Sequence, residues 1–300
     1  MRKIEAPSVY CTNRTNQFSK LSHMKILSIF KVRRKLKKLP VLRVSSIMIL
    51  ILAAIFICSA TMLILDYTLG ADEESEFKEL AGVVLANLNT PGPVPANMHE
   101  PSQTPEQPVI LEQYRELYEL NTDMAGWIKI EGTVIDYPVM YTSDDFYLSH
   151  GFDKKEIKSG IPFIDKRCTV EPFGSNTIIY GHHMKNGTMF AGLENYKNEN
   201  YYKEHPAIRF DTLYTQQEYE IIAVFESQTY RKSDTVFKHY NFLNAGSQAD
   251  FDEYIANIKA LALYDTGVPA SYGDELLTLV TCAYHTENGQ FVVVARKERT

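Results

Sequence analysis

A run of nineteen uncharged residues at positions 47–65 constrains this chain more than any other feature. A helix rises about 1.5 Å per residue, so this run spans about 28 Å, close to the thickness of a bilayer's hydrocarbon core. A cleaved signal peptide has a shorter apolar region, of about 7–15 residues, followed by small residues. A buried helix of a soluble core is the other alternative. The length of the run favours a single transmembrane helix.

Charge is distributed very unevenly about this run. Residues 1–46 contain twelve Lys and Arg and one acidic residue, whereas residues 47–300 contain 19 basic and 36 acidic residues. Basic residues concentrate on the cytoplasmic side of a membrane span. The sequence therefore predicts a cytoplasmic tail (1–46), a cell-membrane anchor (47–65) and an extracellular remainder, which is a single-pass type II topology. Contact with anionic lipid explains the basic tail, and no nucleic-acid partner is expected.

A change in composition divides the extracellular part. Residues 66–108 are first acidic, with a short amphipathic helix expected over 72–89. Six of the chain's thirteen prolines then fall within 90–108. Proline-rich segments with few apolar residues form extended spacers. We expect a linker over 66–108 and a folded domain over 109–300.

Short runs rich in β-branched and aromatic residues dominate this domain, and turn residues separate them. Eight such runs indicate a mainly β fold, either a barrel or a sandwich. Two helices are also expected, one over 111–120 and one that begins at the capping pattern Ser247-x-x-Asp250 and stops at Gly267. The eight runs are 126–130, 134–139, 161–164, 177–180, 207–210, 218–225, 276–280 and 291–294.

Two of these runs end next to residues that can carry chemistry. Cys282 follows the run 276–280, and His182 follows the run 177–180. A cysteine and a histidine that meet in space can form the thiolate–imidazolium pair used in covalent acyl transfer. Three other interpretations stay open: Cys282 as a small buried residue, a disulfide between Cys168 and Cys282, and a zinc site. The zinc site would combine Cys282 with the histidines at 182, 183 and 285.

Several motifs in this order resemble the class B sortases. They are TLVTC at 278–282, YGHHM at 180–184, NGTMF at 186–190, GWI at 126–128, IDYPV at 135–139 and DFYL at 145–148. The resemblance covers about residues 110–296. It implies a closed eight-stranded β-barrel with an N-terminal helix and one helix before the last two strands.

The resemblance also implies an activity. Sortases are cysteine transpeptidases of Gram-positive bacteria that cleave a C-terminal sorting signal of exported proteins and pass them to a peptidoglycan or pilin amine. By this resemblance Cys282 is the nucleophile and His182 the general acid and base, and no cofactor or metal is needed.

One position departs from the family pattern. Sortases carry an arginine at the start of the last strand, and matching that strand to 291–294 places Gln290 there. Arg296 lies on the same strand face but about 20 Å further along. A neutral amide in place of a guanidinium leaves two alternatives to a transpeptidase: a non-catalytic binder of sorting signals and a surface cysteine hydrolase.

Overall fold

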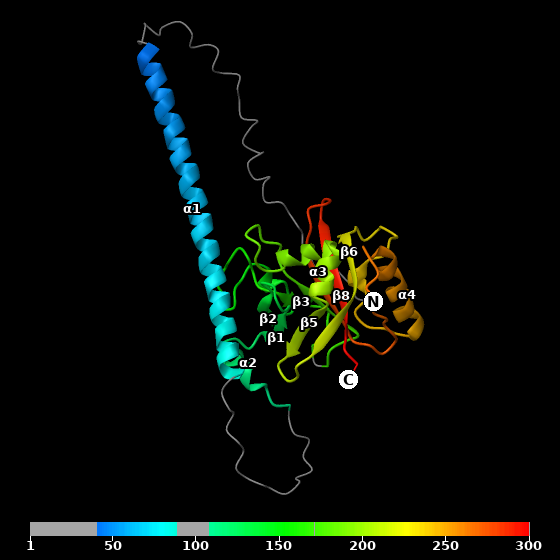
Figure 1. Cartoon of the computed structure of the whole chain (residues 1–300). Coiled ribbons are helices and arrows are strands. Elements are labelled where there is room, and N and C mark those ends of the chain that lie inside the picture. The colour runs from blue at the N-terminus through cyan, green and yellow to red at the C-terminus, as the bar shows by residue number, and fades with distance from the viewer. Residues whose placement is uncertain (1–40, 89–107, 171, 300) are drawn as a thin grey trace, which may run out of the picture. The chain divides into compact units, whose positions relative to one another are not determined.

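A closed β-barrel forms the body of the molecule (Figure 1). The structure is a computed structural model that describes residues 41–88, 108–170 and 172–299. Within them, eight strands close in the order β1-β2-β3-β4-β7-β8-β6-β5. Neighbouring strands are antiparallel except for β2 with β3 and β4 with β7, which are parallel. The strands are β1 (Met124–Lys129), β2 (Asp136–Met140), β3 (Phe163–Ile164), β4 (Asn176–Tyr180), β5 (Ala207–Thr212), β6 (Glu218–Gln228), β7 (Leu276–Cys282) and β8 (Gly289–Lys297).

Each run predicted as a strand overlaps one observed strand, and the mainly β, eight-stranded barrel is confirmed. The central strands are buried almost throughout: every residue of β4 is buried, as is every residue of β8 except Lys297. Branched and aromatic side chains fill both faces of such strands well, which explains why these runs were recognisable.

Two helices flank the barrel as expected. Helix α2 (Glu112–Leu120) buries Tyr114 and Leu117, and the Tyr114 ring stacks on Trp127 of β1. Helix α4 (Gln248–Leu261) begins at Ser247, whose hydroxyl accepts a hydrogen bond from the Asp250 N–H, as the capping pattern predicts. In Figure 1, α4 lies beside β6.

The predicted end of α4 is wrong. The helix ends at Leu261, six residues before Gly267, because Ala262 is extended and the Leu263 N–H donates to the Val224 carbonyl of β6 at 2.8 Å. The hydrogen bond to β6 therefore ends the helix before the chain reaches Gly267. Gly267 instead closes a turn in which its N–H donates to the Asp265 carboxylate.

Short helices that the sequence did not indicate complete this part of the fold. They are the 3-10 helices η3 (Phe146–Leu148), η4 (Ala191–Lys197) and η5 (His239–Asn241) and the α-helix α3 (Glu199–Glu204). Helix η3 lies next to the candidate site, as described below.

Helix α1 (Val41–Leu88) contains a stretch long and apolar enough to cross a membrane. It continues without a break through residues 72–88, where a separate short helix was expected. The chain forms two compact units, one ending at Asp72 and the other comprising residues 73–300, so the last turns of α1 belong to the barrel unit. Most of the predicted tail and the proline-rich segment lie outside the described residues.

Candidate active site

The parallel pairing of β4 and β7 brings Cys282 and His182 together. Tyr180 of β4 is the register partner of Val280 of β7, and the Gly181 N–H donates to the Val280 carbonyl at 3.1 Å. His182 and Cys282 each follow their paired residue by two positions. Because parallel strands run in the same direction, equal offsets place both residues at the same end of the barrel, just beyond the paired strands.

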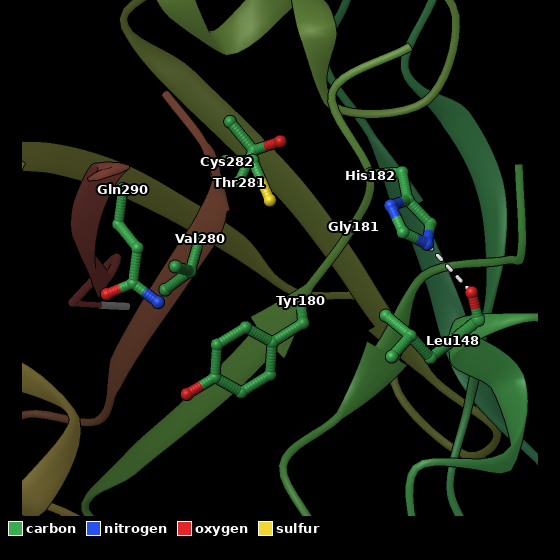
Figure 2. Close-up of a pocket in the computed structure, with 8 residues that line it drawn as sticks. All are labelled: Leu148, Tyr180, Gly181, His182, Val280, Thr281, Cys282 and Gln290. Atoms are coloured by element: carbon green, nitrogen blue, oxygen red, sulfur yellow. Dashed lines mark hydrogen bonds between the residues drawn. The ribbon is translucent and has the colours of Figure 1, made fainter. Parts of the chain in front are cut away.

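Gln290 joins them through the antiparallel pairing of β7 with β8. In this register Cys282 is the direct partner of Gln290. All three side chains line one small cavity of about 10 Å³, together with Leu148, Tyr180, Gly181, Val280 and Thr281 (Figure 2). The structure therefore gathers every predicted site residue at one place.

A main-chain carbonyl fixes the orientation of the His182 ring. Its Nε2 lies 2.7 Å from the carbonyl oxygen of Leu148, at the end of η3. A carbonyl can only accept, so Nε2 carries the proton and Nδ1 is left with its lone pair in the neutral ring. Figure 2 shows Nδ1 on the side of the ring that faces Cys282.

Burial lowers the pKa of His182 below its ordinary value, and the hydrogen bond to the Leu148 carbonyl opposes that shift. A neutral imidazole at pH 7 can take a proton from a thiol or an amine. The same carbonyl stabilises the charged ring once the proton has arrived, so the site is suited to repeated proton transfer.

Gln290 forms the wall of the cavity opposite His182. Its side chain is 3% exposed, and its Oε1 has no hydrogen-bond partner among the described residues. Arg296, the alternative cation, pairs with Leu276 at the far end of β7. Its guanidinium binds the Pro269 carbonyl and the Glu220 carboxylate. The cavity lining therefore contains a neutral amide and no cation.

Cys168 lies outside the cavity lining. It is a free thiol, 4% exposed, and its sulfur accepts a hydrogen bond from the Ile178 N–H. The predicted alternative of a Cys168–Cys282 disulfide is therefore wrong. Burial raises the pKa of the Cys168 thiol to about 12, so it supplies almost no thiolate at neutral pH.

Other histidines considered from the sequence also lie outside the cavity lining. The imidazoles of His183 and His285 lie 3.3 Å and 3.8 Å from the carboxylates of Glu194 and Glu226. That of His205 lies 2.8 Å from the Glu131 carbonyl, and His239 is buried.

Two parts of the site were missed by sequence reasoning. The first is the Leu148 carbonyl, a main-chain atom that no side-chain pattern reveals, although the DFYL motif ends on this residue. The second is the Thr281 hydroxyl, which is buried beside Cys282 with no partner among the described residues. Its position before the cysteine was the only available signal.

A closed barrel that brings a cysteine and a histidine together at the ends of two paired strands has the arrangement of a cysteine acyl transferase. A family model described as "Sortase domain" matches residues 128–298. The chain belongs to the sortase family of cysteine transpeptidases, and within it to class B.

Individual relatives agree with this assignment. The chain is 36% identical to sortase B of Listeria monocytogenes over 187 residues, which is 61% of this chain and 73% of the relative. It is 30% identical to sortase B of Staphylococcus aureus over 188 residues, 61% of this chain and 74% of the relative.

Solved structures are similar as well. A cysteine-to-serine mutant of Clostridium perfringens sortase B is 32% identical with a TM-score of 0.57, over 63% of this chain and 87% of that one. A sortase B complexed with triglycine is 25% identical with a TM-score of 0.64, over 77% and 99%.

Proposed function

We propose that this chain is a membrane-anchored transpeptidase that cleaves the C-terminal sorting signal of exported proteins and joins them to a cell-wall or pilin amine. The observation that supports this most is the equal offset of Cys282 and His182 from paired residues of β4 and β7. It brings a nucleophile and a base into one cavity.

The first half of the reaction forms a thioester. The Cys282 thiolate attacks a backbone carbonyl of the sorting signal and forms a C–S bond. Protonated His182 gives its proton to the departing amine as the C–N bond breaks. The neutral amide of Gln290, opposite Cys282, donates a hydrogen bond to the carbonyl oxygen as it gains negative charge.

The second half consumes the thioester. A primary amine attacks the same carbonyl, His182 takes the proton that the amine loses, and Cys282 departs as a thiolate. The peptide bond that was broken is thus replaced by a new amide bond. The similar sortase B complexed with triglycine supports a small peptide amine as the acceptor, since a glycine peptide presents an unhindered amino group.

Membrane anchoring rests on a separate observation. None of the apolar window of α1 is buried among the described residues, as expected for a helix that contacts lipid. With the basic tail on the cytoplasmic side, residues 109–300 act outside the cell, where exported proteins and cell-wall amines are found.

Mass spectrometry tests this function directly. The full chain in detergent, with a reductant, is incubated with sorting-signal peptides with and without a glycine peptide. We expect an acyl adduct on Cys282 that the amine converts to an amide product. Cys282→Ser should abolish the adduct, whereas Cys168→Ser, the matched control, should retain it.

Each other outcome has a defined meaning. If no peptide gives an adduct, the proposal of a transpeptidase is wrong, and a binding measurement with the same peptides then tests the non-catalytic alternative. If free acid accumulates and no amide forms with any amine, the chain is a hydrolase.

A further inference from the structure

The main chain of His182 is held by a short hairpin that follows it. The Phe190 N–H donates to the His182 carbonyl at 2.9 Å, and His183 forms an antiparallel bridge with Met189. At the tip, the Asn186 side chain accepts a hydrogen bond from the Thr188 hydroxyl. Residues 188–190 are therefore the return strand that fixes the backbone of His182.

Met189 holds an unusual conformation in this return strand. Its φ is +55°, in the left-handed region that side chains other than glycine rarely adopt, and it is 1% exposed. Its N–H donates to the hydroxyl oxygen of Tyr137 on β2 at 3.1 Å. Because Met189 is buried, loss of that acceptor would leave its N–H unsatisfied.

Tyr137 is in turn contacted by the last turns of α1. The ring of Phe77 lies edge-on to the Tyr137 ring, with centroids 5.5 Å apart and planes at 84°, and both side chains are buried. Beside this contact the same face of α1, at Ala81 and Gly82, borders a groove of about 390 Å³. Phe77 is therefore the residue of α1 whose ring contacts Tyr137.

We propose that Phe77 is a positioning residue for catalysis: it fixes Tyr137, whose hydroxyl fixes Met189 and with it the hairpin that orients His182. This inference rests on the proposed role of His182. It makes the last turns of α1 part of the catalytic unit, a role that no sequence motif indicates, since Phe77 lies some 50 residues before the region that matches the family.

Kinetics of three variants of the full chain in detergent micelles test the proposal. Phe77→Ala removes the ring contact, and Tyr137→Phe keeps the ring but removes the acceptor of the Met189 N–H. Val84→Ala, the control, removes a buried apolar group from the same part of α1. We expect kcat to fall about tenfold in the first two, with KM nearly unchanged, and to stay at the parent value in the control.

A readout without substrate separates this inference from the function itself. The pKa of His182 is measured by NMR on chain labelled with ¹³C-histidine. Loosening the hairpin admits water to the ring, so the pKa should rise toward its ordinary value in Phe77→Ala and Tyr137→Phe and stay low in Val84→Ala.

A shifted pKa supports the positioning role even if no peptide is ever cleaved. The inference is overturned if all three variants share the parent's His182 pKa. It is also overturned if Tyr137→Phe matches the parent in kcat.

Discussion

At the scale of single residues, Gln290 is the feature that most distinguishes this chain. It is the direct partner of Cys282. The resemblance to sortases predicts a guanidinium at this position, and this chain has a neutral amide there. A hydrogen bond from a charged donor is about twice as strong as one from a neutral donor. The neutral amide therefore stabilises the oxyanion by about 1–1.5 kcal/mol less than a guanidinium would, unless another donor makes up the difference.

Gln290→Arg should therefore accelerate thioester formation about tenfold, measured as the single-turnover rate of the Cys282 adduct. Gln290→Leu, the apolar control, should slow it by a similar factor. An unchanged rate in both variants would show that another donor, such as the Thr281 hydroxyl or a main-chain N–H, already stabilises the oxyanion.

His239 gives a second prediction at this scale. Both of its ring nitrogens are buried without partners among the described residues, and its ring is edge-on to Phe225 and Tyr240. Burial, aided by the charge of Arg167, lowers the pKa of His239 to about 3. The unfolded chain takes up a proton near pH 6.5 and the folded chain only near pH 3, so stability falls as the pH drops between these values.

The loss of unfolding free energy due to His239 should be close to zero above about pH 7.5 and about 2 kcal/mol at pH 5. Phe fits the same aromatic surroundings and gives up no hydrogen bond. His239→Phe should therefore flatten this part of the pH profile in urea unfolding. An equally steep profile in the variant would assign the acid sensitivity to other groups.

At the scale of elements, the positions of the strands in the sequence were predictable, but the pairing of one strand with another was not. Runs such as 276–280 and 291–294 are buried on both faces, so composition alone reveals them. The parallel pairing of β4 with β7 depends on contacts about a hundred residues apart, which no local pattern encodes. The end of α4 and the Leu148 carbonyl were missed for the same reason: a main-chain hydrogen bond to a distant strand or ring decides each of them.

The join between β4 and its hairpin gives a prediction at this scale. A Cβ on Gly181 would lie 2.6 Å from two ring carbons of Phe190, too close for any real contact. Gly181→Ala should displace the hairpin that carries His182 and lower kcat by tenfold or more, with a loss of about 1–3 kcal/mol in stability.

A second substitution that relieves the contact at Phe190 is the matched control for Gly181→Ala. The double variant Gly181→Ala with Phe190→Leu should recover part of the lost kcat, because leucine can move away from the new methyl group. If it recovers none, the glycine serves another purpose than this close approach.

At the scale of the whole molecule, α1 joins in one helix two segments that the sequence analysis kept apart. Its apolar stretch ends at Leu65, and the same helix continues to Phe77 and Val84, which are buried in the core of the barrel unit. The sequence indicated a linker over 66–108 because acidic and proline-rich compositions are typical of spacers. An amphipathic helix was expected over 72–89 within this linker, but no pattern in the sequence indicated that its apolar residues pack in the core of the barrel unit.

Two truncations test these two segments separately. A chain that begins at Glu73 lacks the apolar stretch and retains Phe77, so it should leave the membrane fraction and keep the kcat of the full chain on soluble peptides. A chain that begins at Val109 keeps every strand and every residue of the cavity but loses Phe77. Its kcat should fall about tenfold, as in Phe77→Ala, and the pKa of His182 should rise. Equal activity of the two truncations would restrict α1 to membrane attachment, because the barrel would then orient His182 without it.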